Sequence, residues 1–214
     1  MSYVLGLDLG TSSLKGLLID KNTNLVYEAS YEYTFYSPKP SYSEQNPEEW
    51  ILALNSIMEE IKSKVIDFGD NLEAISISGQ MHGLVMLDEY NNVIRPAILW
   101  NDTRTSKQCE NILKDFGDKI LSITKNRPLE GFTLPKILWV QENEPNLWEQ
   151  VKHIMLPKDY VVWYLTEKYS TDFSDAAGTL MLDLKNGLKQ SLKNIKLKKC
   201  IYLRFINPKN LLVK

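Results

Sequence analysis

Short apolar runs separated by polar turns mark the first third of the chain. Residues 3–9, 13–20 and 24–36 are rich in leucine, β-branched and aromatic side chains. Polar residues at 10–12 and a turn at 20–24 divide these runs. The pattern predicts three successive strands connected as a meander.

A helical pattern follows the predicted meander. Asn46 is a favourable N-cap residue and Pro47 suits the first helical position, so we predict that a helix begins here. Apolar residues then recur at helical spacing as far as about Val65. The face that they form comprises Trp50, Leu54, Ile57, Met58 and Ile61.

The rest of the chain alternates short strands with helices. This mixed order favours an α/β fold, with a mixed β-sheet flanked by helices. Ligands of such sheets bind beyond the strand ends, so polar residues there are candidates for a site. We predict a buried strand at 72–78, further strands at 84–87, 97–100 and flanking 172–179, and helices at about 105–115, 134–143 and 157–165.

The composition is that of an ordinary soluble globular protein. Of the 214 residues, 43% are hydrophobic and 24% are charged, and no apolar run approaches the length of a membrane span. The first ten residues lack a basic n-region and are interpreted as a strand rather than a signal peptide. Cys109 and Cys200 form no CxxC pair, which indicates a reducing compartment. We therefore expect a cytoplasmic protein without a membrane partner or a zinc site.

Charge is distributed unevenly along the chain. Residues 184–214 contain nine basic residues and no acidic ones, so residues 1–183 hold 16 basic and 27 acidic residues, a net charge of −11. Basic segments can bind nucleic acid. This one has no regular arginine and aromatic spacing, so we expect no nucleic-acid partner.

The first polar interruption has a composition suited to a phosphate and its metal ion. Asp8 offers a carboxylate at the end of the first predicted strand. Gly10, Thr11, Ser12 and Ser13 then offer backbone N–H groups and hydroxyls at one point. Ordinary turn chemistry explains the same residues as an alternative.

Three further polar clusters follow predicted strands or lie in a small-residue loop, at 80–83, 100–104 and 174–179. Their amide, imidazole, carboxylate and guanidinium groups supply donors and acceptors at fixed angles, as a polyhydroxylated ligand requires. Trp100 or Met81 offers an apolar surface for its C–H side.

Structural alternatives exist for several members of these clusters. His82, close to two glycines, is explained equally by a loop histidine bonded to backbone. Asp102 and Asp175 fit helix N-caps. Arg104 fits a surface ion pair of little energetic value.

Several segments resemble the FGGY carbohydrate kinases, and the resemblance covers nearly all of residues 3–184. Residues 131–143, GFTLPKILWVQEN, look like the signature segment of that family, and GLDLGTSSLKG resembles the phosphate loop shared with actin-like ATPases. Within the family the chain is most similar to the xylulokinases. The segments that carry this similarity are YSEQNPEEW (42–50), SGQMHG (78–83), PAILWNDTR (96–104), LPKDY (156–160) and SDAAGT (174–179).

The resemblance implies a ribonuclease-H-like, actin-like ATPase fold. It also implies ATP- and Mg²⁺-dependent phosphorylation of a ketopentose, D-xylulose to D-xylulose 5-phosphate. The small-molecule partners implied are the ketose and ATP, and homodimerisation of longer relatives is a further expectation. Two alternatives stay open: another FGGY kinase acting on ribulose, gluconate or glycerol, and a sugar-binding half-domain without catalysis.

The resemblance assigns a role to each polar cluster. Asp8 is implied to act through Mg²⁺ and its waters, and Met81 and His82 to contact the ketose with support from Gln80. The signature segment is interpreted as structural, with a helix start at Thr133 or Leu134 and with Leu138 and Trp139 buried. The implied phosphate turn comprises Gly10, Thr11, Ser12 and Ser13, and the implied sugar pocket adds Trp100, Asn101, Asp102 and Arg104.

The domain organisation departs from the family pattern. We interpret residues 1–184 as the N-terminal kinase domain and 185–214 as a basic tail, with a frameshift hypothesised just before Ile201. The family's second domain holds a GGGDN-like segment whose aspartate takes the proton from the sugar hydroxyl, and this segment does not occur here. We therefore expect a fragment that lacks its C-terminal kinase domain and is inactive alone.

Overall fold

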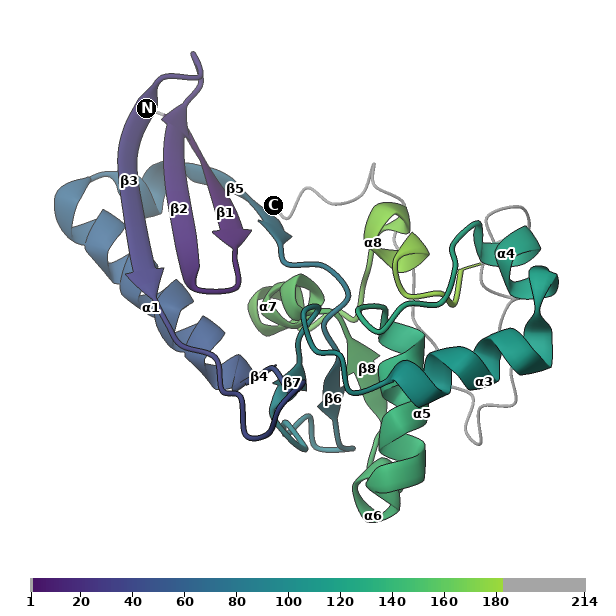
Figure 1. Ribbon diagram of the computed structural model, residues 1–214. Helices are drawn as coiled ribbons and strands as arrows, with labels where there is room; N and C mark the ends of the chain where they lie inside the picture. Colours follow the sequence, from purple (N-terminus) through teal and green to yellow (C-terminus); the bar gives the residue numbers. More distant parts are fainter. Residues whose placement is uncertain (1, 183–214) are drawn as a thin grey trace.

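A four-stranded mixed sheet forms the N-terminal part of the structure, a computed structural model that describes residues 2–182 (Figure 1). Strands β1 (Tyr3–Leu9), β2 (Ser13–Asp20) and β3 (Leu25–Glu32) form an antiparallel meander. Strand β5 (Leu72–Gly79) pairs with β1 in parallel, so the strand order is β3-β2-β1-β5. The carboxyl ends of β1 and β5 therefore lie side by side, Leu9 opposite Gly79.

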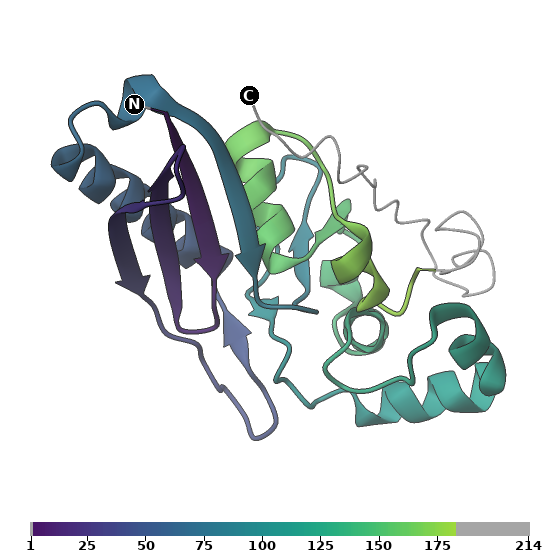
Figure 2. The same ribbon diagram turned by 90° about the horizontal axis from the view of Figure 1, so that it is seen from above.

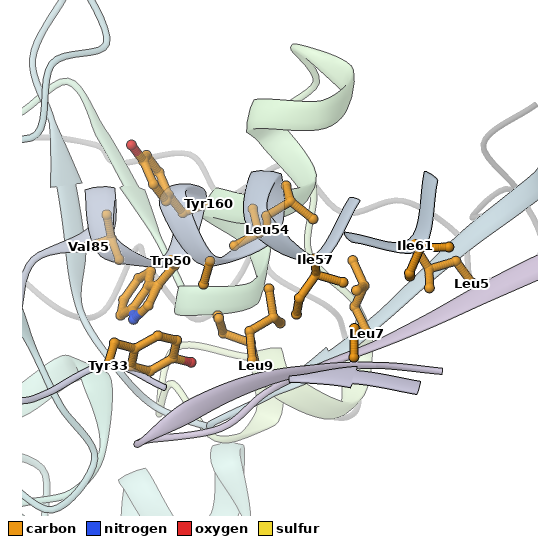
Figure 3. Packing of buried hydrophobic residues seen from close by; sticks show 14 of the residues in the cluster. Leu5, Leu7, Leu9, Tyr33, Trp50, Leu54, Ile57, Ile61, Val85 and Tyr160 are labelled. Atoms are coloured by element: carbon orange, nitrogen blue, oxygen red, sulfur yellow. The ribbon is translucent and has the colours of Figure 1, made fainter. Parts of the chain in front are cut away.

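Helix α1 (Pro47–Lys64) covers one face of this sheet. Alternate residues of β1, including Leu5, Leu7 and Leu9, are buried and point toward the apolar face of the helix (Figure 3). The side chain of Asn46 caps the helix by accepting from the Glu48 amide at 3.2 Å. The period-two pattern of the strand and the 3.6-residue pattern of the helix thus bury one shared core.

The helix lies unusually close to β2 at Gly16. A Cβ atom at this position lies 2.8 Å from Cγ2 of Ile57, closer than carbon atoms pack. Glycine is required here for the approach of helix and sheet and not for a special backbone angle.

A second core lies beside the sheet and is built mainly by the later elements of the chain. Its buried residues include Leu84, Met86, Ile98, Ile137 and Val140. Two short ladders, β4 with β7 and β6 with β8, connect it to the first core, and α7 packs beside β5 (Figure 2). The elements outside the four-stranded sheet and α1 are β4 (Glu44–Gln45), α2 (Phe68–Asn71), β6 (Val85–Leu87), β7 (Ala97–Ile98), α3 (Ser106–Phe116), α4 (Asp118–Thr124), α5 (Thr133–Asn143), α6 (Pro145–Trp148), β8 (His153–Met155), α7 (Pro157–Thr166) and α8 (Phe173–Ala177).

The predicted mixed α/β fold is confirmed, and three local predictions are wrong. The third strand ends at Glu32 and not at residue 36. The strand at 72–79 is half-buried because, among the described residues, it is paired along one edge only. No strand flanks residues 172–179 within residues 2–182, and residues 173–177 form helix α8, capped by Asp172.

Smaller differences concern the signature segment and short elements. Helix α5 begins at Thr133 as predicted, but Leu138 and Trp139 are half-buried. Helices α2, α4 and α6 and strands β4 and β8 have no counterpart in the prediction. The predicted basic tail at 185–214 and the hypothesised frameshift lie outside the described residues. Within residues 2–182, no helix has both the length and the apolar character that crossing a membrane requires.

We expect Gly16→Ala to lower the free energy of unfolding by about 1–3 kcal/mol, because the added methyl group overpacks the contact with Ile57. Urea unfolding followed by circular dichroism measures this change. Gly69→Ala is the matched control, since a Cβ atom there meets no heavy atom within 4 Å. Equal stability of the two variants would contradict the close approach of α1 to β2.

Candidate functional site

The hairpin between β1 and β2 is held by backbone hydrogen bonds and by one tyrosine. The Gly10 amide donates to the Ser13 carbonyl at 2.9 Å and to the Asp8 carbonyl at 3.1 Å. The Tyr33 hydroxyl donates to the Gly10 carbonyl at 2.7 Å, and the Tyr33 amide donates to the Ser12 carbonyl at 3.0 Å. Burial and the charge of Asp8 raise the pKa of Tyr33, so its hydroxyl stays a donor. The hairpin tip is thereby preorganised.

The tip exposes groups that suit an anion. Within residues 2–182, the amide N–H groups of Thr11 and Ser12 donate to no protein acceptor. Such unpaired amides beside hydroxyl groups form an anion-binding concavity.

The carboxylate of Asp8 is exposed next to this tip. The described part of the chain contains no cluster of three or more His, Cys, Asp or Glu residues that could hold a metal by themselves. Mg²⁺ commonly uses one or two carboxylates together with phosphate oxygens and water. A single aspartate beside an anion-binding turn therefore fits Mg²⁺ that is bound jointly with a phosphate.

The polar segment at 100–104 contacts the hairpin through Trp100. Its indole N–H donates to the hydroxyl of Thr11 at 3.0 Å, and its side chain is 44% exposed. Asn101 beside it is exposed as well. The structure therefore brings together the hairpin at 8–13 and the segment at 100–104.

Gln45 is a buried residue that the sequence analysis missed. Its side-chain N–H₂ group donates to the carbonyls of Thr11 at 3.1 Å and Thr34 at 3.0 Å. Its side-chain oxygen accepts from Trp50 at 2.7 Å and from Gln80 at 3.2 Å. One amide thus joins the hairpin, helix α1 and the segment at 80–83. It lies within a family-like segment, YSEQNPEEW, but nothing in that pattern indicates its partners.

The segment after β5 forms a tight turn centred on His82. His82 has a φ of 61°, and the Gly83 amide donates to the Met81 carbonyl at 2.7 Å. The imidazole lies 4.7 Å from the ring of Phe132 and so close to Gly178 that a Cβ there would lie 2.4 Å from Nδ1. Burial, together with the nearby charge of Lys136, lowers the pKa of His82 and favours the neutral imidazole.

Asp102 and Arg104 form a buried ion pair, which contradicts both structural alternatives considered for them. Asp102 is fully buried and accepts from the Ser43 amide at 2.6 Å, and the residue preceding α3 is Thr105. The guanidinium group of Arg104, whose side chain is 1% exposed, contacts Asp102 and Glu44, each at 2.7 Å. Asp102 is therefore not an N-cap, and Arg104 is not a surface residue.

The candidate residues differ in their access to solvent. Exposure decides which of them can touch a ligand directly. Asp8, Ser12, Met81, Trp100 and Asn101 are exposed, Gly10, Thr11, Ser13 and His82 are half-buried, and Gln80, Asp102 and the side chain of Arg104 are buried.

A lysine-centred ion cluster holds the loop at 172–179. Lys158 contacts the carboxylates of Asp159, Asp172 and Asp175 at 2.6, 2.8 and 3.2 Å. Asp175 therefore belongs to this cluster, and the N-cap of α8 is Asp172. The cluster fixes the loop that contains Gly178 against His82.

Lys136 in the signature segment is fully buried. Its ammonium group donates to the carbonyl oxygens of His82, at 3.2 Å, and Gly131. Burial lowers the pKa of Lys136 to about 7, although the charge of Asp102 acts in the opposite direction. The sequence analysis treated this segment as structural and did not single out Lys136.

We expect Arg104→Met to lower the free energy of unfolding by about 3–5 kcal/mol, because it leaves buried Asp102 without its cation. Urea unfolding measures the loss. Arg127→Met, which removes an exposed arginine, is the control and should change stability by less than about 0.5 kcal/mol. Losses of similar size in both variants would show that the ion pair does not stabilise the fold.

We expect Lys136 to make the protein more stable as the pH rises from about 7 to about 9.5. Its pKa is about 7 in the folded chain and near 10.5 when exposed, so the unfolded chain binds more protons in this window. Urea unfolding across the window should show a smaller rise for Lys136→Met, by about 1 kcal/mol or more.

Cys109 contributes to the pH dependence in the opposite direction in both proteins, and the charge of Lys136 itself acts to lower the pKa of this thiol. Burial raises the pKa of that thiol to about 11, so its effect on stability falls with rising pH in both proteins. Parallel pH profiles for the two proteins would contradict a depressed pKa of Lys136.

Residues 3–193 match the N-terminal domain of the FGGY family of carbohydrate kinases. A relative named xylulose kinase, from Lactococcus lactis subsp. lactis, is 59% identical over 185 residues, which cover 86% of this chain and 37% of the relative. The chain thus spans about a third of the length of that relative.

Solved structures give the same family. The crystal structure of a xyloylose kinase from Brucella ovis aligns with a TM-score of 0.82 and 41% identity, covering 85% of this chain and 37% of that one. A gluconate kinase from Lactobacillus acidophilus aligns with a TM-score of 0.88 and 27% identity, covering 97% and 42%. The actin-like ATPase fold expected from the sequence is confirmed by these neighbours. Because the family's N-terminal domain matches nearly all of the described residues, the chain belongs to the FGGY family of carbohydrate kinases.

Proposed function

We propose that this chain supplies the phosphate-binding and sugar-binding surfaces of an ATP-dependent kinase that converts D-xylulose to D-xylulose 5-phosphate. The observation that carries the proposal is the hydrogen bond from Trp100 to Thr11, which joins the two kinds of surface. The 59% identity to a xylulose kinase supports the choice of sugar.

The hairpin tip is the proposed phosphate side of the site. Gly10, Thr11, Ser12 and Ser13 place amides and hydroxyls around the transferring phosphate, and Asp8 holds Mg²⁺ through water. Mg²⁺, when bound, neutralises charge on the phosphate oxygens. Phosphoryl transfer depends mainly on positioning and charge stabilisation, which a preorganised turn provides.

The segments at 80–83 and 100–104 are the proposed sugar side. Met81, Trp100 and Asn101 are exposed and able to contact the ketose directly, and His82 lies at the same edge. Gln80 is buried and supports this segment through its hydrogen bond to Gln45.

Asp102 and Arg104 are also buried, so we assign them a supporting role and no direct sugar contact. Their ion pair holds the loop that presents Trp100 and Asn101.

In this proposal, none of the candidate carboxylates described above acts as the general base. Asp102 is buried in its ion pair, and Asp175 is bound by Lys158. Asp8 is assigned to the metal, so we expect the base to come from outside the described residues 2–182. A base must lie within hydrogen-bond reach of the sugar hydroxyl.

Location and partners complete the proposal. The buried free thiol of Cys109 suits a reducing compartment, so we propose a cytoplasmic location. The proposed partners are the ketose and ATP, without nucleic acid or membrane, and homodimerisation remains a prediction for the longer relatives.

The decisive experiment titrates the purified chain with D-xylulose, D-ribulose, D-gluconate and glycerol by calorimetry. We expect D-xylulose to bind most tightly and Trp100→Ala to weaken it by about tenfold or more, because the substitution removes a large stacking surface. Lys114→Met, which alters an exposed lysine on α3, is the control.

The other outcomes separate the rival functions. Tightest binding of D-gluconate would favour the alternative of an FGGY kinase that acts on gluconate. Absence of binding for every sugar would contradict the proposed sugar surface. A coupled ADP-release assay with D-xylulose, Mg²⁺ and ATP tests whether the general base lies outside the chain. If the chain turns over and Asp8→Ala abolishes this turnover, the 214 residues contain a sufficient set of catalytic groups.

A further inference from the structure

His82 occupies a backbone conformation that a non-glycine residue adopts only under constraint. Its φ of 61° lies in the left-handed region, and the bond from the Gly83 amide to the Met81 carbonyl closes a three-residue turn around it. Turns of this kind are rare and strained for L-residues. The surrounding structure must therefore hold His82 in place.

Two donors from the start of α5 hold the carbonyl of His82. The Thr133 hydroxyl donates to this oxygen at 3.1 Å, and the Lys136 ammonium group donates at 3.2 Å. Thr133 is the first residue of the helix, and Lys136 is the fourth, at the end of the first turn. Both side chains are fully buried.

The position of Lys136 is unfavourable for a cation, and the hydrogen bonds together with the charge of Asp102 offset this cost in part. The first turn of a helix repels a cation, because the helix dipole is positive there. Burial penalises the charge further, and the described residues place no carboxylate within ion-pair distance of Lys136. Its contacts are the carbonyl oxygens of His82 and Gly131. The ammonium group therefore donates its hydrogen bonds to these two carbonyl oxygens.

Gly131 connects the same lysine to Trp100. A Cβ atom at Gly131 lies 2.8 Å from the Trp100 carbonyl oxygen, so the two backbones are in direct contact. The ammonium group of Lys136 thus lies between the two segments that carry His82 and Trp100.

We propose that Thr133 and Lys136 are positioning residues of the sugar site, which hold His82 in its left-handed turn and Gly131 against Trp100. The inference rests on the proposed function for the role of His82 and Trp100 as sugar contacts. The signature segment then serves to set the distance between two ligand-contacting segments that are far apart in the sequence. Neither Thr133 nor Lys136 touches the sugar itself.

The test uses the fact that the chain has only two histidines, His82 and His153. Labelling the chain with histidine enriched in carbon isotope at the carbonyl yields two carbonyl NMR signals, and His153→Gln assigns them. We expect Thr133→Val and Lys136→Met each to shift the His82 signal and to leave the His153 signal in place. Thr133→Ser keeps the hydroxyl and should restore the signal of the unaltered chain.

A second experiment measures the affinity of the same variants for D-xylulose by calorimetry. We expect Thr133→Val and Lys136→Met to weaken binding by about tenfold, since the competent turn becomes a minor conformation. Thr133→Ser should bind as the unaltered chain does, and Lys114→Met on the exposed face of α3 is the lysine control.

Each outcome decides the proposal. An unshifted His82 signal in Thr133→Val would overturn it, even if stability falls, because a merely structural role predicts that result. A shifted signal with unchanged D-xylulose affinity would also overturn it. If the unaltered chain binds no D-xylulose, the proposed function fails, while the carbonyl signals still decide whether α5 holds His82. If Lys136→Met does not fold, the comparison of Thr133→Val with Thr133→Ser decides the proposal.

Discussion

The hydrogen bonds of one buried side-chain amide, that of Gln45, hold the parts of the site together. This amide bonds to the hairpin at Thr11, to helix α1 at Trp50 and to the segment after β5 at Gln80. A buried polar network rigidifies a structure when its members are satisfied and is costly when they are not. The spacing of the proposed phosphate and sugar surfaces therefore depends on a residue that belongs to neither.

The neighbour of Gln45 supports the other side of the site. Glu44 and Gln45 are the two residues of strand β4, and successive side chains of a strand point to opposite faces. Gln45 faces the hairpin, whereas Glu44 binds Arg95 and Arg104. Arg104 in turn holds Asp102, beneath the exposed Trp100 and Asn101. A two-residue strand thus divides its side chains between two networks.

The proposed ligand contacts are exposed or half-buried residues, supported by other residues that make no ligand contact. Trp100 is supported by Gly131 and the Asp102 ion pair, and His82 by α5 and the Lys158 cluster. Preorganisation of this kind reduces the conformational freedom lost on binding. It also explains why a segment that resembles a family signature lies behind the site and not at its surface.

The sequence by itself determined the elements whose patterns are local. The alternation of β1, the cap at Asn46 and the glycine-bearing hairpin are properties of neighbouring residues, and they predicted the meander, α1 and the candidate residues from Asp8 to Arg104. The family-like segments predicted the fold. Only the tertiary structure decided that Asp102 and Arg104 are buried, that residues 173–177 are helical, and that Gln45 and Lys136 connect distant segments. The burial of Asp102 and Arg104 and the bonds of Gln45 and Lys136 depend on contacts between residues 35 to 60 positions apart in the chain, such as Gln45 with Gln80 and Glu44 with Arg104, and no local pattern of residue types encodes such partners.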